Sequence, residues 1–321
     1  MVSSLAWGHW RLAARNPDRN HKLANAALDS GIAFFDTADI YGFDGSAGFG
    51  STEEALGLLL AAEPGLRRRI VIATKGGINP GVPYNSSEAY LTGTIDASLA
   101  RLGIDTIDLW QVHRPDVLSH PHEIASAVGK AHAAGKIRAF GVSNFTVAQI
   151  ASIAACSPVP LSSTQPELSA LCIEPVVNGE SDQAIDLDLA VLAWSPLGNG
   201  QLAEPTEPRA IAVAAALDVV ADDQRVSRSA AALSWIMAHP ARAIPIIGSQ
   251  TAARIAEAAD ALRVRWTRRS WYAVLVALAN CRYRKLASVL PEITTPCGAS
   301  WVEAPERKAR PPAGDPVSAS A

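Results

Sequence analysis

Eight short, apolar and β-prone runs recur through the first 250 residues, and helical patterns separate them. Strands that are buried on both faces of a parallel sheet read as continuous apolar runs of this kind. Eight strand–helix repeats in one chain favour a closed (β/α)8 TIM barrel over an open, doubly wound sheet. We therefore predict an α/β protein with a single barrel domain over residues 1–280, whose strands lie at 5–10, 32–36, 70–74, 107–112, 137–142, 161–164, 189–194 and 243–247.

Local signals predict where several helices begin and end. Ser51 and Glu54 have the spacing of a capping box, in which the serine side chain accepts from the Glu54 N–H and the glutamate reaches back. A helix should therefore start at Ser51. A glycine in the left-handed conformation ends a helix at little steric cost. On that basis, we expect the helical stretches 21–30, 87–102 and 121–134 to end at Gly31, Gly103 and Gly135.

The composition favours a soluble cytoplasmic protein that acts on a small molecule. The chain of 321 residues is 49% hydrophobic and 18% charged, and no apolar run reaches the ~18 residues that span a bilayer. A net charge of -3 supplies no field that would attract nucleic acid or an anionic membrane. Oligomeric state cannot be read from these features. The cysteines have neither CxxC nor CxxH spacing, which predicts free thiols in a reducing compartment; they are Cys156, Cys172, Cys281 and Cys297.

Polar or reactive residues directly follow several of the predicted strands. In a parallel barrel the carboxyl ends of all strands meet on one face, and function should be sought there. Residues that are far apart in the sequence would therefore share one mouth, namely Asp36, Lys75, His113, Ser143, Asn144, Gln165, Trp194 and Ser195.

Tyr41, in a turn after Asp36, completes a set of side chains suited to proton transfer. A free tyrosine has a pKa of about 10, and a neighbouring ammonium such as Lys75 is expected to lower it. Asp36 would keep Lys75 charged in a dry pocket and orient it. His113 would point a carbonyl oxygen at the Tyr41 hydroxyl or relay the proton. Such a site protonates an oxygen while hydride reaches its carbon.

Each of these residues also has an ordinary structural interpretation. Asp36 alone would suit a turn, and Tyr41 alone a half-buried aromatic position. Their coincidence at one barrel face favours the functional interpretation. A zinc site at His113, His120 and His122 is an alternative, but the i, i+4 spacing with a supporting carboxylate is missing. We therefore predict no metal.

Seven motifs, taken in order, resemble those of the aldo-keto reductases. The resemblance runs from about residue 5 to about residue 280, and each motif stands at a predicted strand end. The motifs are DTADIYG (36–42), ATKGG (73–77), HRPD (113–116), GVSNF (141–145), Gln165 in TQPELS, SPLGNGQL (195–202) and IPIIGSQ (244–250).

The resemblance implies an NADP-dependent oxidoreductase that reversibly reduces an aldehyde or ketone to an alcohol. It makes Tyr41 the general acid, Lys75 and Asp36 its tuning partners, and His113 the residue that orients the substrate. The positions that it assigns to the cofactor are Ser143, Asn144, Gln165, Trp194, Ser195, Leu197, Gly198, Gly248, Ser249, Gln250, Arg254 and Glu257.

Within that set, the resemblance places the nicotinamide ring against Trp194, where the family more often has tyrosine or phenylalanine. Its carboxamide would lie at residues 143, 144 and 165, and the pyrophosphate along 195–198. Ser249 and Arg254 match positions that meet the adenosine 2′-phosphate, for which a guanidinium is well shaped. NADPH is therefore favoured over NADH. Gln250 stands where many relatives have a basic residue, so the phosphate would depend more on Arg254.

The end of the chain departs from the family. Residues 263–310 carry ten arginines and lysines, and the last residues are polar and rich in proline. We expect residues 281–321 to form a flexible, solvated extension. An arm that binds a partner or nucleic acid is the alternative.

Two functional hypotheses follow. The first is a reductase in which Tyr41 protonates the carbonyl oxygen. The second is a redox sensor or regulatory subunit that binds the cofactor with little turnover. The complete set of Asp36, Tyr41, Lys75 and His113 favours the reductase, because a sensor has no need of an acid.

Overall fold

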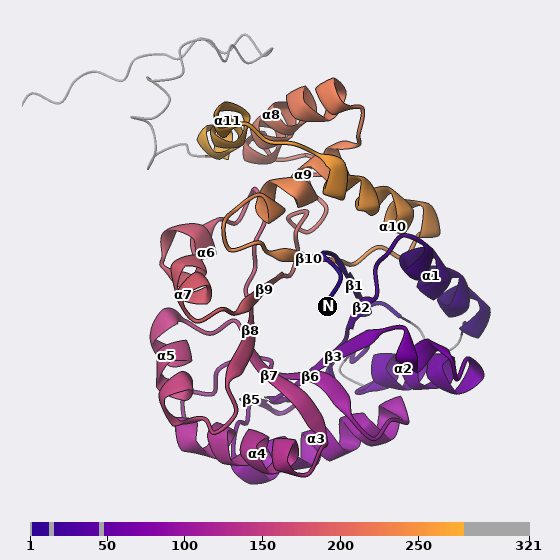
Figure 1. Ribbon diagram of the computed structural model, residues 1–321, viewed down its shortest axis with the longest axis vertical. Coiled ribbons are helices and arrows are strands. Elements are labelled where there is room, and N and C mark those ends of the chain that lie inside the picture. Colours follow the sequence, from indigo (N-terminus) through magenta and orange to yellow (C-terminus); the bar gives the residue numbers. More distant parts are fainter. Residues whose placement is uncertain (1, 13–15, 45–47, 279–321) are drawn as a thin grey trace, which may run out of the picture.

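The computed structural model describes residues 2–12, 16–44 and 48–278 and confirms the predicted closed barrel (Figure 1). Around the ring the strand order is β1-β10-β9-β8-β7-β6-β3-β2, and every pairing is parallel. The barrel strands are β1 (Ala6–Gly8), β2 (Phe34–Asp36), β3 (Val71–Gly76), β6 (Ile107–Val112), β7 (Ile137–Ser143), β8 (Leu161–Gln165), β9 (Ala190–Ala193) and β10 (Ile244–Ile247).

The ring closes on its first strand. Ala6 of β1 is in register with Ile246 of β10 on one side and with Phe34 of β2 on the other. All eight predicted strands therefore exist, each within two residues of its expected position at either end.

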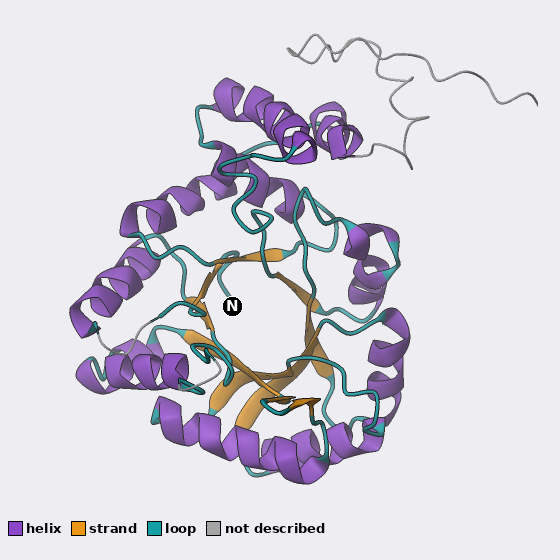
Figure 2. Ribbon diagram, turned by 180° about the vertical axis from the view of Figure 1, so that it is seen from behind, coloured by secondary structure: helices purple, strands orange, loops and turns teal. Residues whose placement is uncertain are grey.

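Helices surround the strands on the outside of the barrel (Figure 2). Helix α8 packs against both α9 and α11, and α8 and α11 lie side by side beyond the ring (Figure 1). The helices are α1 (Pro17–Asp29), α2 (Ser51–Ala62), α3 (Glu88–Leu102), α4 (Pro121–Ala133), α5 (Val147–Cys156), α6 (Glu174–Val177), α7 (Glu180–Asp186), α8 (Pro208–Gln224), α9 (Arg228–Met237), α10 (Ala252–Ala258) and α11 (Arg268–Leu278), with short 3-10 turns η1 (Leu66–Arg68) and η2 (Ala259–Arg263).

Apolar side chains fill two layers, and their alternation along the strands decides which polar residues face inward. A small cluster inside the ring includes Phe34 and Ala73, whereas Phe35 and Ile72 belong to the larger cluster beneath the helices. Because successive residues of a strand point to opposite faces, the residue two positions after Phe34 also faces inward. The same holds two positions after Ala73. The side chains of Asp36 and Lys75 are thereby brought into the barrel.

The predicted helix ends were partly right. Gly31, Gly103 and Gly135 have φ angles of 74°, 64° and 70°, which confirms the left-handed stops. The helix does begin at Ser51, as predicted, but the capping box was wrong, because the N-cap is Gly50, which has no side chain to cap it. The Ser51 hydroxyl instead lies against Gly42, where a β-carbon would come within 2.0 Å of its oxygen.

One feature was not predicted, a small antiparallel hairpin after β3 formed by β4 (Ile78–Asn79) and β5 (Val82–Tyr84). The extension predicted for 281–321 lies outside the described residues. Among the described helices, none is both long and apolar enough to cross a lipid bilayer.

Candidate active site

The buried ion pair between Asp36 and Lys75 is the centre of the site. Lys75 is fully buried, and its Nζ donates to Asp36 Oδ1 at 2.9 Å, to Asp36 Oδ2 at 2.7 Å and to the Thr37 carbonyl at 2.8 Å. An ammonium has three donors, so all of them are used. Burial lowers the pKa of Lys75, but the interactions with Asp36 and Tyr41, hydrogen bonds included, together outweigh this effect and raise the pKa above its ordinary value. Lys75 therefore stays charged.

Tyr41 lies beside this pair, with the centre of its ring 5.1 Å from Lys75 Nζ. A short turn positions it, because the Tyr41 N–H donates to the Ala38 carbonyl at 3.2 Å. Burial raises the pKa of Tyr41 above its ordinary value, and Lys75 opposes this without overcoming it. The prediction of a lowered Tyr41 pKa was therefore wrong for this structure. The phenol is protonated at neutral pH, which is the form that a proton donor needs.

His113 follows β6 and faces Tyr41. The two rings meet edge to face, with their centres 5.6 Å apart. The backbone N–H of His113 donates to the backbone carbonyl of Gly76 at 2.8 Å. Burial, with the charges of Lys75 and Arg114, holds the pKa of His113 well below its usual range. Its Nδ1 is buried and has no hydrogen-bond partner among the described residues. A neutral imidazole thus lies next to the phenol.

A chain of hydrogen bonds joins the ion pair to the predicted nicotinamide positions. The side-chain Nε2 of Gln165 donates to Asp36 Oδ1 at 2.9 Å, and the Ser143 hydroxyl donates to the backbone carbonyl of Gln165 at 2.9 Å. Asn144 Nδ2 donates to Ser143 Oγ at 2.8 Å, and its Oδ1 accepts from Trp194 Nε1 at 2.9 Å. Residues from β2, β7, β8 and the end of β9 are therefore linked in one network at the carboxyl ends of the strands.

The segment after Trp194 forms a tight turn of small residues. Ser195, Gly198 and Asn199 have φ angles of 54°, 57° and 55°, and the Ser195 hydroxyl donates to Asn199 Oδ1 at 2.7 Å. A β-carbon at Gly198 would lie 2.8 Å from a methyl group of Leu171. The close approach explains why glycine stands there. Leu197 packs against the core.

The segment after β10 joins the same end of the barrel. The Ser249 carbonyl accepts from Trp7 Nε1 at 3.2 Å, and Gly248 gives Trp10 room, since a β-carbon there would lie 3.3 Å from the indole nitrogen. The Arg254 side chain is 67% exposed and lies 3.6 Å from Glu204, which is itself 82% exposed. Glu257 is half-buried on α10. The Arg254 guanidinium is accessible because its side chain is exposed. An exposed ion pair contributes little to stability, so another anion could replace Glu204 at little cost.

Two arginines near the predicted site residues were not predicted from the sequence. The Arg114 guanidinium lies 5.9 Å from the centre of the Trp194 ring, although the HRPD motif was singled out only for its histidine. Arg19 on α1 donates to the Gln250 carbonyl at 3.2 Å. Arg19 therefore adds a positive charge, besides that of Arg254, to the segment after β10, in which Gln250 itself is uncharged. No motif could have indicated Arg19, because the contact spans most of the chain.

The zinc alternative finds no support in the described part of the chain, where no group of three or more His, Cys, Asp or Glu residues could hold a metal ion. His120 and His122 stack with their ring centres 5.0 Å apart, away from the ion pair at the start of α4. His120 caps that helix by accepting from the His122 N–H. These two histidines therefore have a structural role.

A parallel (β/α)8 barrel with ionisable side chains gathered at the carboxyl ends of its strands is the architecture of a barrel enzyme. A model of the Aldo/keto reductase family matches residues 4–274. The chain belongs to this family of oxidoreductases.

Similar proteins include two that are named 6-dehydroglucose reductase. One, from Novosphingobium aromaticivorans, is 60% identical over 86% of this chain and 91% of that protein. The other, from Agrobacterium fabrum, is 34% identical over 84% of this chain and 92% of that protein. Among solved structures, the glycerol dehydrogenase AKR11B4 from Gluconobacter oxydans is similar with a TM-score of 0.75 and 27% identity, covering 93% of this chain and 96% of that one.

Proposed function

We propose that this protein is an NADPH-dependent reductase that converts an aldehyde or ketone into an alcohol, and reversibly an alcohol into the carbonyl compound. The observation that carries the proposal is the protonated Tyr41 beside the Asp36–Lys75 pair, with the neutral His113 ring against it. A carbonyl oxygen held between a phenol and an imidazole accepts a proton as its carbon gains hydride.

Each side chain has a distinct task in this proposal. Tyr41 gives its hydroxyl proton to the oxygen, and Lys75 stabilises the phenolate that remains. Asp36 fixes Lys75 through both carboxylate oxygens. His113, being neutral, donates a hydrogen bond that orients the carbonyl group and does not itself supply the proton. Proton delivery thus belongs to one residue and orientation to another.

The chain's residues fit a dinucleotide at the same mouth. Ser195 and Gly198 have left-handed backbone conformations, and the small residues of this turn would allow a pyrophosphate to approach the backbone. Arg254, which is exposed, would supply the positive charge that a 2′-phosphate needs. Arg19 adds a second positive charge to the same segment, because it donates to the Gln250 backbone carbonyl. When bound, NADPH supplies the hydride for the carbonyl carbon. Arg19 offsets the absence of a basic residue at position 250, which supports NADPH over NADH.

The proposed substrate is a sugar aldehyde. Two relatives are named for 6-dehydroglucose, a hexose whose C6 carries an aldehyde that reduction converts into a primary alcohol. The mouth offers groups that suit a polyol, since Trp10 is 52% exposed and Arg114 brings several donors beside Trp194. A cytoplasmic location is part of the proposal, and the free thiols Cys156 and Cys172 are compatible with it.

The test is to follow the absorbance of NADPH and of NADH with 6-dehydroglucose, simple aldehydes and simple ketones. We expect turnover with NADPH, a higher kcat/KM for the sugar aldehyde than for an aldehyde without hydroxyl groups, and weaker turnover with NADH. Tight cofactor binding with no turnover on any carbonyl compound would refute the reductase and favour the redox sensor.

A further inference from the structure

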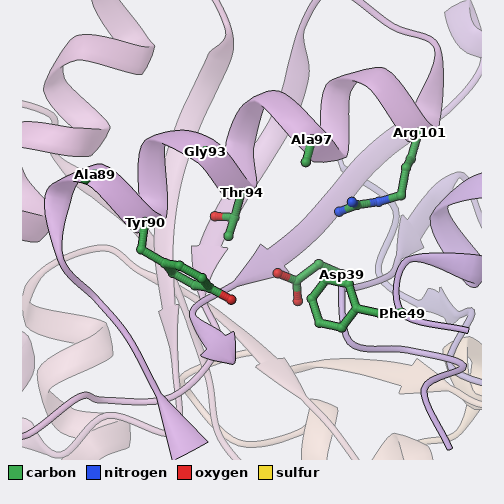
Figure 3. A pocket seen from close by; sticks show the side chains of 8 residues that line it. All are labelled: Asp39, Phe49, Ala89, Tyr90, Gly93, Thr94, Ala97 and Arg101. Atoms are coloured by element: carbon green, nitrogen blue, oxygen red, sulfur yellow. The ribbon is translucent and has the colours of Figure 1, made fainter. Parts of the chain in front are cut away.

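A pocket with a volume of about 330 Å³ lies between α3 and the segment that follows β2, away from the residues of the proposed mechanism (Figure 3). The rings of Phe49 and Tyr90 and the side chain of Arg101 line it, and Gly93 and Ala97 leave it open along the helix. Figure 3 shows the Asp39 carboxylate pointing toward the side of the pocket where Tyr90 and Thr94 of α3 lie. The mechanism proposed above uses none of these side chains.

The Asp39 carboxylate is the unusual group in this pocket. Its backbone is fixed, because the Asp39 N–H donates to the Lys75 carbonyl at 3.0 Å and the Asp39 carbonyl accepts from the Gly50 N–H at 2.6 Å. The side chain is fully buried, and no side chain of the described residues donates to either carboxylate oxygen, so that the Ile40 backbone N–H is the one hydrogen bond that acts on its pKa. A buried carboxylate with so few donors is costly to ionise, so a cation bound beside it would stabilise the charged form.

The nearby charges show which kind of occupant fits. Glu53 on α2 is already paired, since its Oε2 accepts from Arg101 Nε at 2.7 Å and its Oε1 accepts from the Thr74 hydroxyl at 2.5 Å. The guanidinium of Arg101 is therefore committed to Glu53. An ionised Asp39 leaves one negative charge in the pocket without a partner, so a single positive charge would balance it.

The lining distinguishes an organic cation from a metal ion. A hard metal ion requires about six or more oxygen ligands, and the described residues contain no group of three or more His, Cys, Asp or Glu that could serve. The aromatic rings of Phe49 and Tyr90 instead suit an ammonium group, which is attracted to the face of a ring. The short residues Gly93 and Ala97 leave space for an alkyl chain.

We propose that this pocket binds a small organic ammonium ion, with the ammonium group at Asp39 and the alkyl chain along α3. The site is separate from the mouth of the barrel, and binding to it can be measured without turnover. Failure of this proposal therefore leaves the reductase proposal untouched.

Binding should depend on pH in a defined direction. Burial and the charge of Glu53 raise the pKa of Asp39 to about 8, while Arg101 and Lys75 oppose the rise. Tyr90, the remaining ionisable group that lines the pocket, also has a raised pKa and stays neutral. Below pH 8 the ligand must displace a proton from Asp39, so its affinity should rise roughly tenfold per pH unit from pH 6 to pH 8.

The experiment is isothermal titration calorimetry of the full chain with n-butylammonium and with n-butanol, its uncharged analogue, at pH 6 and pH 8. We expect n-butylammonium to bind more tightly at pH 8 than at pH 6, and at least about tenfold more tightly than n-butanol at pH 8. Two variants address separate parts of the site. Asp39→Asn removes the charge and keeps the shape, and Gly93→Leu fills the pocket, because a β-carbon at Gly93 meets no atom within 4 Å.

Both variants should weaken n-butylammonium binding by about tenfold or more, whereas Asp105→Asn, at an exposed carboxylate, should bind like the wild type. Neither test variant threatens folding, since Asn keeps the shape of the buried carboxyl group and Leu is a better helix former than Gly. Equal binding of alcohol and ammonium, undiminished binding by Asp39→Asn, or no binding at pH 8 would each overturn the proposal.

Discussion

Replacing Lys75 by methionine should destabilise the protein more than any single change at its surface. The side chain is fully buried, and all three ammonium donors are used, two on Asp36 and one on the Thr37 carbonyl. The Lys75→Met change keeps the length of the side chain but leaves the Asp36 carboxylate, among the described residues, with the Gln165 amide as its one donor. An uncompensated charge would then lie inside the barrel.

The magnitude follows from the cost of such a charge. Breaking a buried ion pair by removing one partner costs about 3–5 kcal/mol. Because 1 kcal/mol shifts the melting temperature of a domain of 150–250 residues by about 2–4 °C, the loss should be about 6 °C or more. The double change Asp36→Asn and Lys75→Met removes the stranded charge, so it should recover most of that loss. Neither variant should reduce a carbonyl compound.

Thermal unfolding followed by tryptophan fluorescence at pH 7 measures these differences. Lys130→Met is the matched control, because Lys130 pairs with Glu88 at the surface and exposed pairs contribute about 0–1 kcal/mol. The reasoning would be refuted if Lys75→Met melted within about 2 °C of the wild type. It would also fail if the double variant were no more stable than the single one.

Three further predictions concern other charged groups. First, kcat/KM should be flat from pH 6 to pH 9, because the pKa of His113 lies well below its usual range and that of Tyr41 above it; a half-maximal point near pH 6.5 would contradict this. Second, Arg254→Ala and Arg19→Ala should each raise the Kd for NADPH about tenfold and leave that for NADH unchanged, measured by quenching of protein fluorescence; equal effects on both cofactors would argue against a 2′-phosphate contact. Third, the raised pKa of Asp39, about 8 in the folded chain, means that the unfolded chain releases this proton first as pH rises. Wild-type stability is therefore lost between about pH 4 and pH 8, and the advantage of Asp39→Asn should grow by roughly 1.4 kcal/mol per pH unit from pH 5 to pH 7 in urea unfolding; a constant difference would show that Asp39 is ionised.

The barrel could be predicted from the sequence because buried parallel strands leave a strong signal. The run at 107–112 matches β6 in full, and even the polar run at 161–164 lies within β8 (Leu161–Gln165). Once strands are placed, their carboxyl ends locate the mouth, and alternation turns Asp36 and Lys75 inward. The positions of these side chains thus follow from topology.

Local chemistry was harder to predict where two neighbours compete for one role. Ser51 and Glu54 fit a capping box, yet Gly50 takes the cap and Glu53 turns inward to meet Thr74 and Arg101. The hairpin β4–β5 was missed because its strands have two and three residues, too short for a periodic pattern. The contacts of Glu53 with Thr74 and Arg101 are tertiary and leave no local pattern in the sequence. The strands of the hairpin are too short to show the alternation that predicts a strand.

Electrostatics depended on burial, which the sequence does not report. The effect of Lys75 on the Tyr41 pKa has the predicted sign, but the cost of burying a phenolate exceeds it. Arg19 and Arg114 reach the site from a helix and a loop, through contacts that no spacing rule describes. The meeting of Asp36 and Lys75 was therefore predictable, whereas the balance of charges around them was not.

The most direct test of the proposed mechanism is to compare Tyr41→Phe with the wild type in single-turnover reduction of 6-dehydroglucose, together with the Kd for NADPH. The variant keeps the ring against His113 and removes only the hydroxyl group that donates the proton. The account predicts that the rate falls by a factor of about 10² or more while the Kd stays within about twofold. A Tyr41→Phe variant that reduces the aldehyde at the wild-type rate would contradict it.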